Sequence, residues 1–249
     1  MKWAGETVTS RGVTERGFQL DCDDRRIPGI AWTPEAPKGP TATVLIGHGG
    51  GGHKRQPHLL ALARRLVRHH GIAAVAIDGP AHGERAPAGP EPSLDERRAA
   101  MRGGQVVEDM IADWQATLDA IQALPEIASG RVGYWGLSMG TMFGLPFVAR
   151  EPRVEAAVLG LMGSLPAFGG NLAAYAADVQ CPVLFLQQLQ DELVPPEAAV
   201  ALFDQISSGD KELRANTGAH AAVPPDAFDE TEAFLARHLC SPGETEDDS

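Results

Sequence analysis

The sequence is poor in cysteine and in positive charge, and each scarcity excludes a class of protein. Three cysteines occur in 249 residues, at the widely spaced positions Cys22, Cys181 and Cys240. An odd number at such spacing is typical of reduced thiols rather than of a disulfide framework or a cysteine-ligated zinc cluster. Lysine and arginine number 21 against 33 acidic residues, which gives a net charge of −12. Because surfaces that bind nucleic acid cluster positive side chains, we expect no nucleic-acid partner.

Long hydrophobic runs are also missing. No apolar stretch reaches the roughly 18 residues of a membrane-spanning helix, and the N-terminal segment MKWAGETVTSRG has no signal-peptide core. Hydrophobic residues still make up 43% of the chain, enough for a sizeable core. We therefore expect a folded cytoplasmic protein without a membrane partner, a monomer or homodimer. Residues 1–240 should form one domain, and the acidic tail 241–249 should be disordered.

Short apolar runs alternate with amphipathic stretches along most of the chain. Continuous apolar runs, typical of parallel strands buried on both faces, lie at 41–47, 72–78, 131–136, 154–160 and 182–188. Helical periodicity is found at 58–70, 106–124, 139–150, 196–206 and 227–239. Three further strands are expected at 17–22, 27–34 and 211–218, the first two as an antiparallel pair. The pattern predicts an α/β fold, with a mostly parallel sheet of about eight strands and helices on both faces.

One long segment, residues 83–104, shows no clear period. Loops longer than about 15 residues in compact domains are usually lids, binding loops or disordered segments. We interpret this segment as a candidate lid loop.

A serine between two glycines, Gly136-Leu137-Ser138-Met139-Gly140, stands where a strand should end and a helix begin. A sharp turn there holds the serine in strained backbone angles and brings both glycines close together, so both must lack bulk. A helix start beside the hydroxyl also offers free backbone N–H groups to developing negative charge. These residues resemble the nucleophile elbow of the α/β-hydrolase superfamily, and the resemblance extends over roughly residues 17–239.

Members of this superfamily carry a serine, an acid and a histidine in that chain order. Asp191 follows the strand expected at 182–188, and His220 follows the one at 211–218. The resemblance therefore implies Ser138 as nucleophile, His220 as base and Asp191 as the acid that orients the base.

Two departures leave alternatives open at the acid. Gln188 stands where the family commonly has a glycine three residues before the acid, and Glu192 is an alternative acid. Asp191 is also suited to cap the helix that follows it.

The glycine run IGHGGGGH at 46–53 resembles the oxyanion loop of the same superfamily. The resemblance implies an oxyanion hole made by the backbone N–H of Met139 and that of Gly50, with Gly51 as the alternative. His48 would brace this loop rather than react.

The same glycines also fit a dinucleotide-binding fingerprint over residues 47–52, with Asp78 as a ribose-binding acid. This alternative predicts an NAD(P)-binding oxidoreductase. Against it, the segment HKRQP separates the glycines from the next helix, and Pro57 is suited to the first position of that helix. The histidines near this run have no carboxylate or thiolate cluster beside them, so we expect no cofactor and no metal.

The resemblance implies hydrolysis of a small or medium carboxylic ester through an acyl-enzyme, in the dienelactone hydrolase-like or small esterase/peptidase-like branch. Because true dienelactone hydrolases use a cysteine nucleophile, the serine argues against dienelactone as substrate. Thioesterase, lactonase and peptidase activities remain alternatives, as does a hydrolase-like protein that binds without turnover. Only 53 residues separate Ser138 from Asp191, so no large cap domain is expected between them. We expect a substrate pocket with walls from Met142, Phe143, Leu161 and Met162.

Overall fold

The computed structural model describes residues 1–37, 39–87, 93, 96, 99, 104–125, 127, 130–165 and 171–240. Gly83–Arg85, at the start of the candidate lid, forms a short 3₁₀ turn. Most of the remaining lid segment and the whole tail 241–249 lie outside the described residues. The lid and the tail therefore stay predictions.

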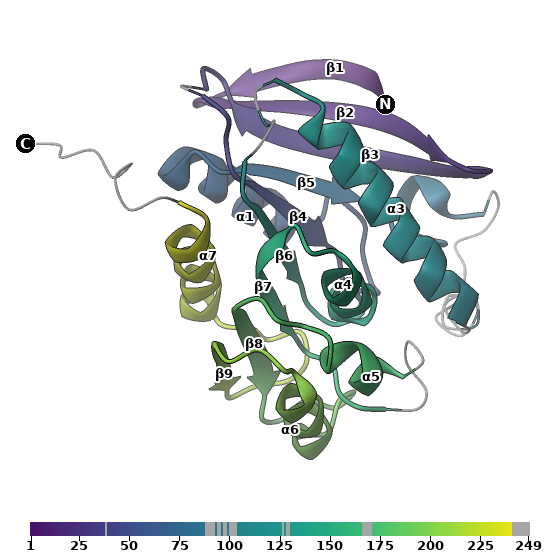
Figure 1. Cartoon of the computed structure of the whole chain (residues 1–249), viewed down its shortest axis with the longest axis vertical. Helices are drawn as coiled ribbons and strands as arrows, with labels where there is room; N and C mark the ends of the chain where they lie inside the picture. Colours follow the sequence, from purple (N-terminus) through teal and green to yellow (C-terminus); the bar gives the residue numbers. More distant parts are fainter. Residues whose placement is uncertain are drawn as a thin grey trace, which may run out of the picture.

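One sheet of nine strands runs through the molecule in the order β1-β2-β3-β5-β4-β6-β7-β8-β9 (Figure 1). The strands are β1 (Lys2–Ser10), β2 (Val13–Cys22), β3 (Arg25–Pro34), β4 (Thr43–Gly47), β5 (Ala73–Ile77), β6 (Val132–Gly136), β7 (Val154–Gly160), β8 (Val183–Gln188) and β9 (Lys211–Asn216). β1, β2, β3 and β5 pair antiparallel, and every pair from β5 to β9 is parallel. The predicted α/β fold with a mostly parallel sheet is confirmed.

The central strands are apolar because both of their faces are covered. Every residue of β4, β5 and β6 is buried, as the continuous apolar runs predicted. Beneath the start of the helix that follows β6, the rings of Trp114, Tyr134 and Phe147 pack within about 6 Å of one another. Such aromatic pairs contribute roughly 0.5–1.5 kcal/mol each beyond their buried area. β6, the strand that leads to Ser138, therefore packs against a cluster of aromatic rings.

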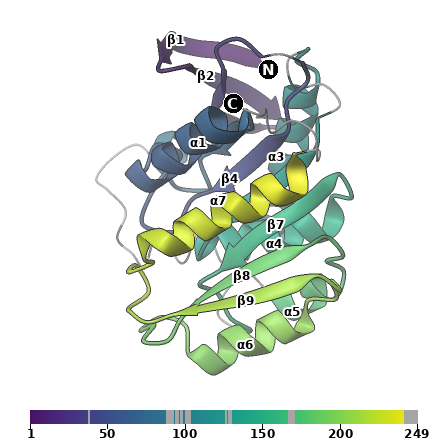
Figure 2. The same ribbon diagram turned by 90° about the vertical axis from the view of Figure 1, so that its left-hand side faces the viewer.

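Helices cover the two faces of the sheet unequally. They are α1 (Pro57–His70), α3 (Gly104–Gln122), α4 (Met139–Arg150), α5 (Leu172–Ala176), α6 (Pro196–Gln205) and α7 (Pro225–Leu239). α1 and α7 lie side by side over one face, where their apolar residues form one core cluster (Figure 2). α3, α4, α5 and α6 contribute to the second core cluster on the other face. None of the helices in the described part of the chain has the length and apolar character needed to span a bilayer.

Two elements were missed by the sequence analysis. β1 is exposed along nearly its whole length, so its sequence carries no buried apolar alternation to signal a strand. α5 has only five residues, too few for a helical period to show. The three cysteines are not joined to one another.

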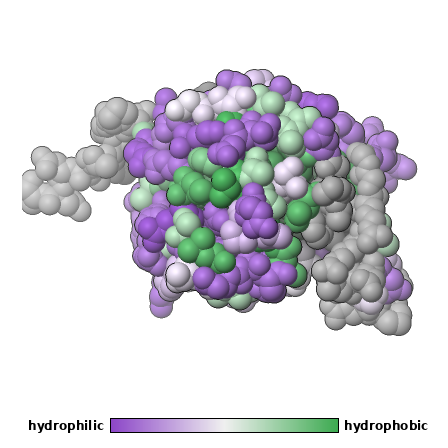
Figure 3. All heavy atoms as spheres, turned by 90° about the horizontal axis from the view of Figure 1, so that it is seen from below, coloured by the Kyte–Doolittle hydropathy of each residue, from purple (hydrophilic) through white to green (hydrophobic). Residues whose placement is uncertain are grey.

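The surface mixes charged and apolar residues. Figure 3 shows a face on which hydrophobic residues form small patches separated by hydrophilic ones. Among the described residues, the exposed large hydrophobic side chains are Met1, Val8, Leu189, Leu193, Val200 and Leu213. Leu193 also borders the cavity described below, which places apolar surface at the edge of that cavity.

Candidate active site

Ser138 occupies a strained turn between β6 and α4. Its φ of 59° and ψ of −118° lie in a region that residues with a Cβ rarely adopt. A Cβ added at Gly140 would lie 2.7 Å from the carbonyl oxygen of Gly47, and one added at Gly136 would lie 2.8 Å from the carbonyl carbon of Gly140. Both contacts are shorter than real Cβ atoms make, so the turn requires glycine on each side of the serine.

The structure brings Ser138, His220 and Asp191 together from three separate loops. His220 Nε2 lies 2.9 Å from Ser138 Oγ, and His220 Nδ1 lies 2.7 Å from Asp191 Oδ2. The Asp191 side chain is 2% exposed and that of His220 is 12% exposed. With the ring oriented by the carboxylate, Nε2 is free to accept the proton of the serine hydroxyl.

Asp191 contacts His220 and also fixes the turn that follows it, but it does not cap α6, whose N-cap is Pro195 with no side-chain cap hydrogen bond. Its Oδ1 accepts hydrogen bonds from the backbone N–H groups of Leu193 and Val194, at 2.8 and 2.9 Å, while Oδ2 faces His220. Glu192, the alternative acid, accepts instead from the backbone N–H of His220 at 2.9 Å. Its carboxylate therefore supports the histidine loop, whereas the contact with the ring belongs to Asp191.

Gln188, the residue that departs from the family pattern, fixes the loop that carries His220. Its side chain is buried, and Nε2 donates to the carbonyl oxygens of Ala219 at 3.1 Å and Ala222 at 2.8 Å. These carbonyls flank His220 in the sequence, so the end of β8 holds the histidine loop in place. The sequence analysis noted the position of Gln188 but missed this role, because its partners lie more than 30 residues away.

The glycine loop after β4 is braced by two buried histidines. His48 Nε2 accepts from the backbone N–H of Gly79 at 2.8 Å, and Nδ1 lies 2.9 Å from the carbonyl oxygen of Gly49. His82 Nε2 lies 2.9 Å from the carbonyl oxygen of Gly50. These contacts fix the backbone of the loop that carries the candidate oxyanion glycine. They also make His48 a brace, as the sequence analysis expected.

Met139 supplies the other candidate donor. It is the first residue of α4, so its backbone N–H belongs to the turn whose donors have no partner within the helix. Gly50, Gly51 and Met139 line the same cavity as Ser138. The three residues predicted to form the oxyanion hole therefore lie around the same cavity as the serine.

Asp78 is engaged in a buried ion pair. Its carboxylate lies 2.5 Å from Lys54 Nζ and accepts from the backbone N–H groups of Lys54 and Glu84, both at 2.9 Å. Burial raises the pKa of this carboxyl, but the hydrogen bonds from Lys54 and Glu84 hold it below its usual value. α1 begins at Pro57, well after the glycine run. Neither feature suits a dinucleotide site, in which the helix starts within the glycines and the acid faces a ribose.

A largely apolar cavity of about 790 Å³ opens beside Ser138 and His220. Three of the four predicted wall residues line it, namely Met142, Leu161 and Met162. The fourth, Phe143, is buried in the core beneath α4 and is not among the residues that line the cavity. Sequence reasoning did not predict several other wall residues, namely Gly49, Gln56, His58, Trp135, Leu137, Glu192, Leu193, Val194, Ala221, Val223 and Phe228. Several of these residues directly follow a strand or begin a helix. Such positions lie at the carboxyl edge of the sheet, where ligands bind in α/β folds, and this was the signal in the sequence that could have identified them.

Burial of His48 should make stability depend on pH. Burial lowers the pKa of His48 to about 4, so the folded protein keeps the ring neutral where an unfolded chain protonates it. Between pH 6.5 and 4 the unfolded state binds more protons, and the free energy of unfolding should fall by roughly 3 kcal/mol. Urea titrations across this window should give a flatter pH dependence for His48→Gln than for the wild type. The control is His53→Gln, at an exposed position of the same loop, and an unchanged slope in His48→Gln would contradict the assignment.

One group of side chains in the described part of the chain has the composition of a metal site. It consists of His69, His70 and Glu232, on α1 and α7, and none of the three lines the cavity.

Comparison with known proteins places the chain among esterase-related folds. The profile of the dienelactone hydrolase family matches residues 27–221. The structure of a novel cold-adapted esterase from an Arctic intertidal metagenomic library, bound to polyethylene glycol, superimposes with a TM-score of 0.87 at 40% sequence identity. That match covers 96% of this chain and 100% of the esterase.

More distant structures share the fold alone. An acetyl xylan esterase from Paenibacillus sp. R4 matches with a TM-score of 0.73 at 19% identity, over 94% of this chain and 88% of that one. A shorter sequence match, 45% identical over 64 residues, links the chain to an uncharacterised 31.7 kDa protein of Escherichia coli. It spans 25% of this chain and 22% of that protein.

Proposed function

The chain belongs to the dienelactone hydrolase family, and from this membership we propose that it hydrolyses carboxylic esters through an acyl-enzyme formed on Ser138. It is a carboxylesterase-like serine hydrolase. The observation that carries the proposal is His220, whose two ring nitrogens face the Ser138 hydroxyl and the Asp191 carboxylate. The 40% identity to an esterase that matches over its whole length supports the same class of reaction.

The chemistry follows from this geometry. Ser138 Oγ attacks the ester carbonyl carbon while His220 Nε2 takes the hydroxyl proton, and Asp191 stabilises the imidazolium that forms. The carbonyl oxygen becomes negative and is bound by the backbone N–H of Met139 with that of Gly50 or Gly51. The C–O bond to the alcohol then breaks, and His220 returns the proton to the leaving oxygen. Water repeats the sequence on the acyl-enzyme and releases the acid.

The cavity supports an uncharged, mainly apolar substrate. Its walls near the serine are methionine, leucine and aromatic side chains, which bind acyl groups through burial of apolar area. A volume of about 790 Å³ exceeds what an acetyl group fills, so small to medium esters are accommodated.

A series of p-nitrophenyl esters of increasing acyl length tests the proposal on purified protein. We expect release of p-nitrophenol with a burst equal to the enzyme concentration, and kcat/KM that rises with acyl length until the cavity is filled. No release from any ester, together with quenching of protein fluorescence by NADH, would instead favour the oxidoreductase. Thioester, lactone and peptide substrates compared in the same preparation separate the alternatives within the hydrolases.

The proposal also covers the assembly state, the cellular location and the domain organisation of the enzyme. We propose a monomer or homodimer in the cytoplasm, with residues 1–240 as one domain and 83–104 as its lid. Light scattering on the purified protein measures the assembly state directly.

A further inference from the structure

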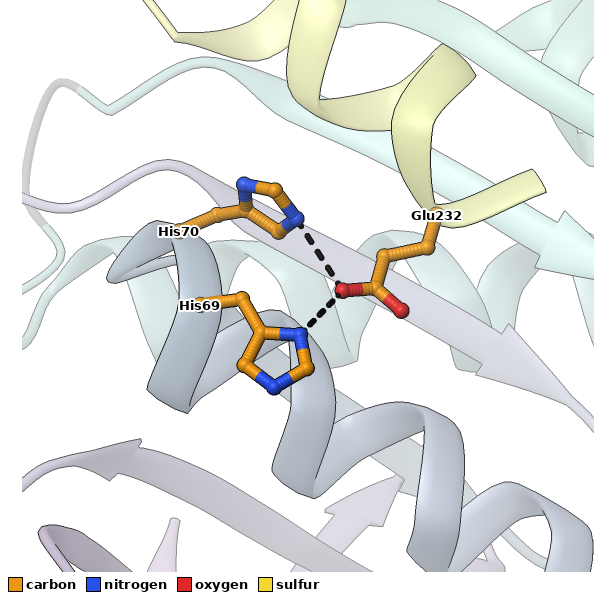
Figure 4. Close-up of side chains that lie close together, drawn as sticks. All are labelled: His69, His70 and Glu232. Atoms are coloured by element: carbon orange, nitrogen blue, oxygen red, sulfur yellow. Dashed lines mark hydrogen bonds and ion pairs between the residues drawn. The ribbon is translucent and has the colours of Figure 1, made fainter. Parts of the chain in front are cut away.

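His69 and His70, the last two residues of α1, converge on Glu232 of α7 (Figure 4). His69 Nδ1 lies 2.7 Å from Glu232 Oε1, and His70 Nε2 lies 3.0 Å from the same oxygen. One ring uses Nδ1 and the other Nε2, which lets neighbouring residues on a helix reach a single point. Three ligand-type atoms therefore lie within 4.8 Å of one another, at the contact between two helices.

The carboxylate is buried while the imidazoles are reachable from solvent. The Glu232 side chain is 4% exposed, and those of His69 and His70 are 52% and 28% exposed. Arg65 Nε lies 2.5 Å from the other carboxylate oxygen, Oε2, and Arg65 is also paired with Asp229. The guanidinium thus holds the carboxylate in position and leaves Oε1 facing the two rings.

We propose that His69, His70 and Glu232 form a transition-metal site, with Zn²⁺ as the expected ion. Two imidazole nitrogens and one carboxylate oxygen are ligands that zinc accepts at about 2.0–2.2 Å, with water in the fourth position. A tetrahedron with such bonds separates its ligand atoms by about 3.3 Å. The nitrogen-to-oxygen distances of 2.7 and 3.0 Å would lengthen toward this value, and the two imidazole nitrogens, which lie within 4.8 Å of each other, would have to adopt the same separation as the rings turn toward the ion.

The proposal departs from the expectation of no metal, which rested on the histidines near the glycine run. His69 and His70 were not considered there, because Glu232 lies more than 160 residues away from them in the sequence. Only the packing of α1 against α7 creates the site.

A bound ion would fasten the two helices that flank the active site. His58, near the start of α1, and Phe228, near the start of α7, both line the cavity, and their ring centroids lie 6.3 Å apart. His69 and His70 hold the opposite end of α1 to the middle of α7. Because the ion binds the folded arrangement and not the separated helices, it raises the free energy of unfolding.

Calorimetric titration with zinc chloride, after removal of bound metal with EDTA, tests the proposal. We expect one Zn²⁺ per chain, and a dissociation constant at least about tenfold higher in His69→Ala and in Glu232→Gln. Zinc should raise the thermal unfolding midpoint of the wild type and leave that of both variants unchanged. Cobalt(II) bound in place of zinc should give visible d–d absorption in the wild type, reduced in His69→Ala.

His238→Ala is the matched control, since His238 lies on α7 but outside the cluster. It should bind zinc as the wild type does. Glu232→Gln also removes one of the two carboxylate partners of Arg65, so loss of folding is a second effect to separate in that variant. His69 is half exposed, and His69→Ala tests the site without that effect. Wild-type zinc affinity in His69→Ala, or absence of zinc binding to the wild type, would overturn the proposal.

Discussion

Replacing Ser138 with alanine should lower kcat for p-nitrophenyl acetate by a factor on the order of 10⁶. The variant removes the atom that forms the acyl-enzyme, and no neighbouring nucleophile within the described cavity wall occupies its place. Alanine should fit the same turn. The turn depends on the absence of a Cβ at the flanking glycines, Gly136 and Gly140, and not on the hydroxyl of Ser138. The fold and the apolar walls should therefore persist. Stopped-flow release of p-nitrophenol measures the loss.

Covalent labelling by a fluorophosphonate gives an independent readout of the same variant. The probe reacts with an activated serine, so the wild type should be labelled once and Ser138→Ala not at all. Ser10→Ala, which removes an exposed serine of β1, should be labelled as the wild type is. Labelling of Ser138→Ala at the wild-type rate would refute Ser138 as the nucleophile.

Asp191→Asn should lower kcat by about 10⁴-fold with little change in KM. The amide keeps the size of the carboxylate and its oxygen still accepts from Leu193 and Val194. Its NH₂ group, however, faces His220 Nδ1 and favours the tautomer with the proton on Nε2, which then has no lone pair for the serine proton. The pH dependence of kcat and KM for a short acyl ester, measured separately, distinguishes this effect from lost binding.

Glu192→Gln is the matched comparison for Asp191→Asn. Glu192 accepts a hydrogen bond from the backbone N–H of His220, and a glutamine oxygen can accept the same bond. We expect kcat to stay within about tenfold of the wild type. If Glu192→Gln lost more activity than Asp191→Asn, Glu192 would be the orienting acid.

The parts of the site that sequence predicted are those with a local signal. The elbow around Ser138 is specified by glycines two residues away on each side, and close contacts at both positions explain the spacing. The strands β4 to β8 were recognised because burial on both faces leaves continuous apolar runs.

The parts that sequence missed depend on contacts between distant segments. Gln188 acquires its role only when β8 and the His220 loop lie together. Phe143 and Met142 are neighbours on α4, whose residues from Met139 to Val148 are all buried, so periodicity does not tell which one faces the cavity. Exposed β1 had no hydrophobic pattern to reveal it.

The order of the strands has a further consequence for how the enzyme loses activity. Ser138 follows β6 in the middle of the sheet, whereas His220 follows β9, which forms one edge of the sheet and pairs with β8 alone among the described strands. Edge strands open locally at lower free energy than central ones, because fewer hydrogen bonds and apolar contacts hold them. Local opening of β9 would move His220 away from Ser138, while Ser138 stays in place. Heat inactivation would then begin as a reversible local event, well below the temperature at which the whole sheet melts.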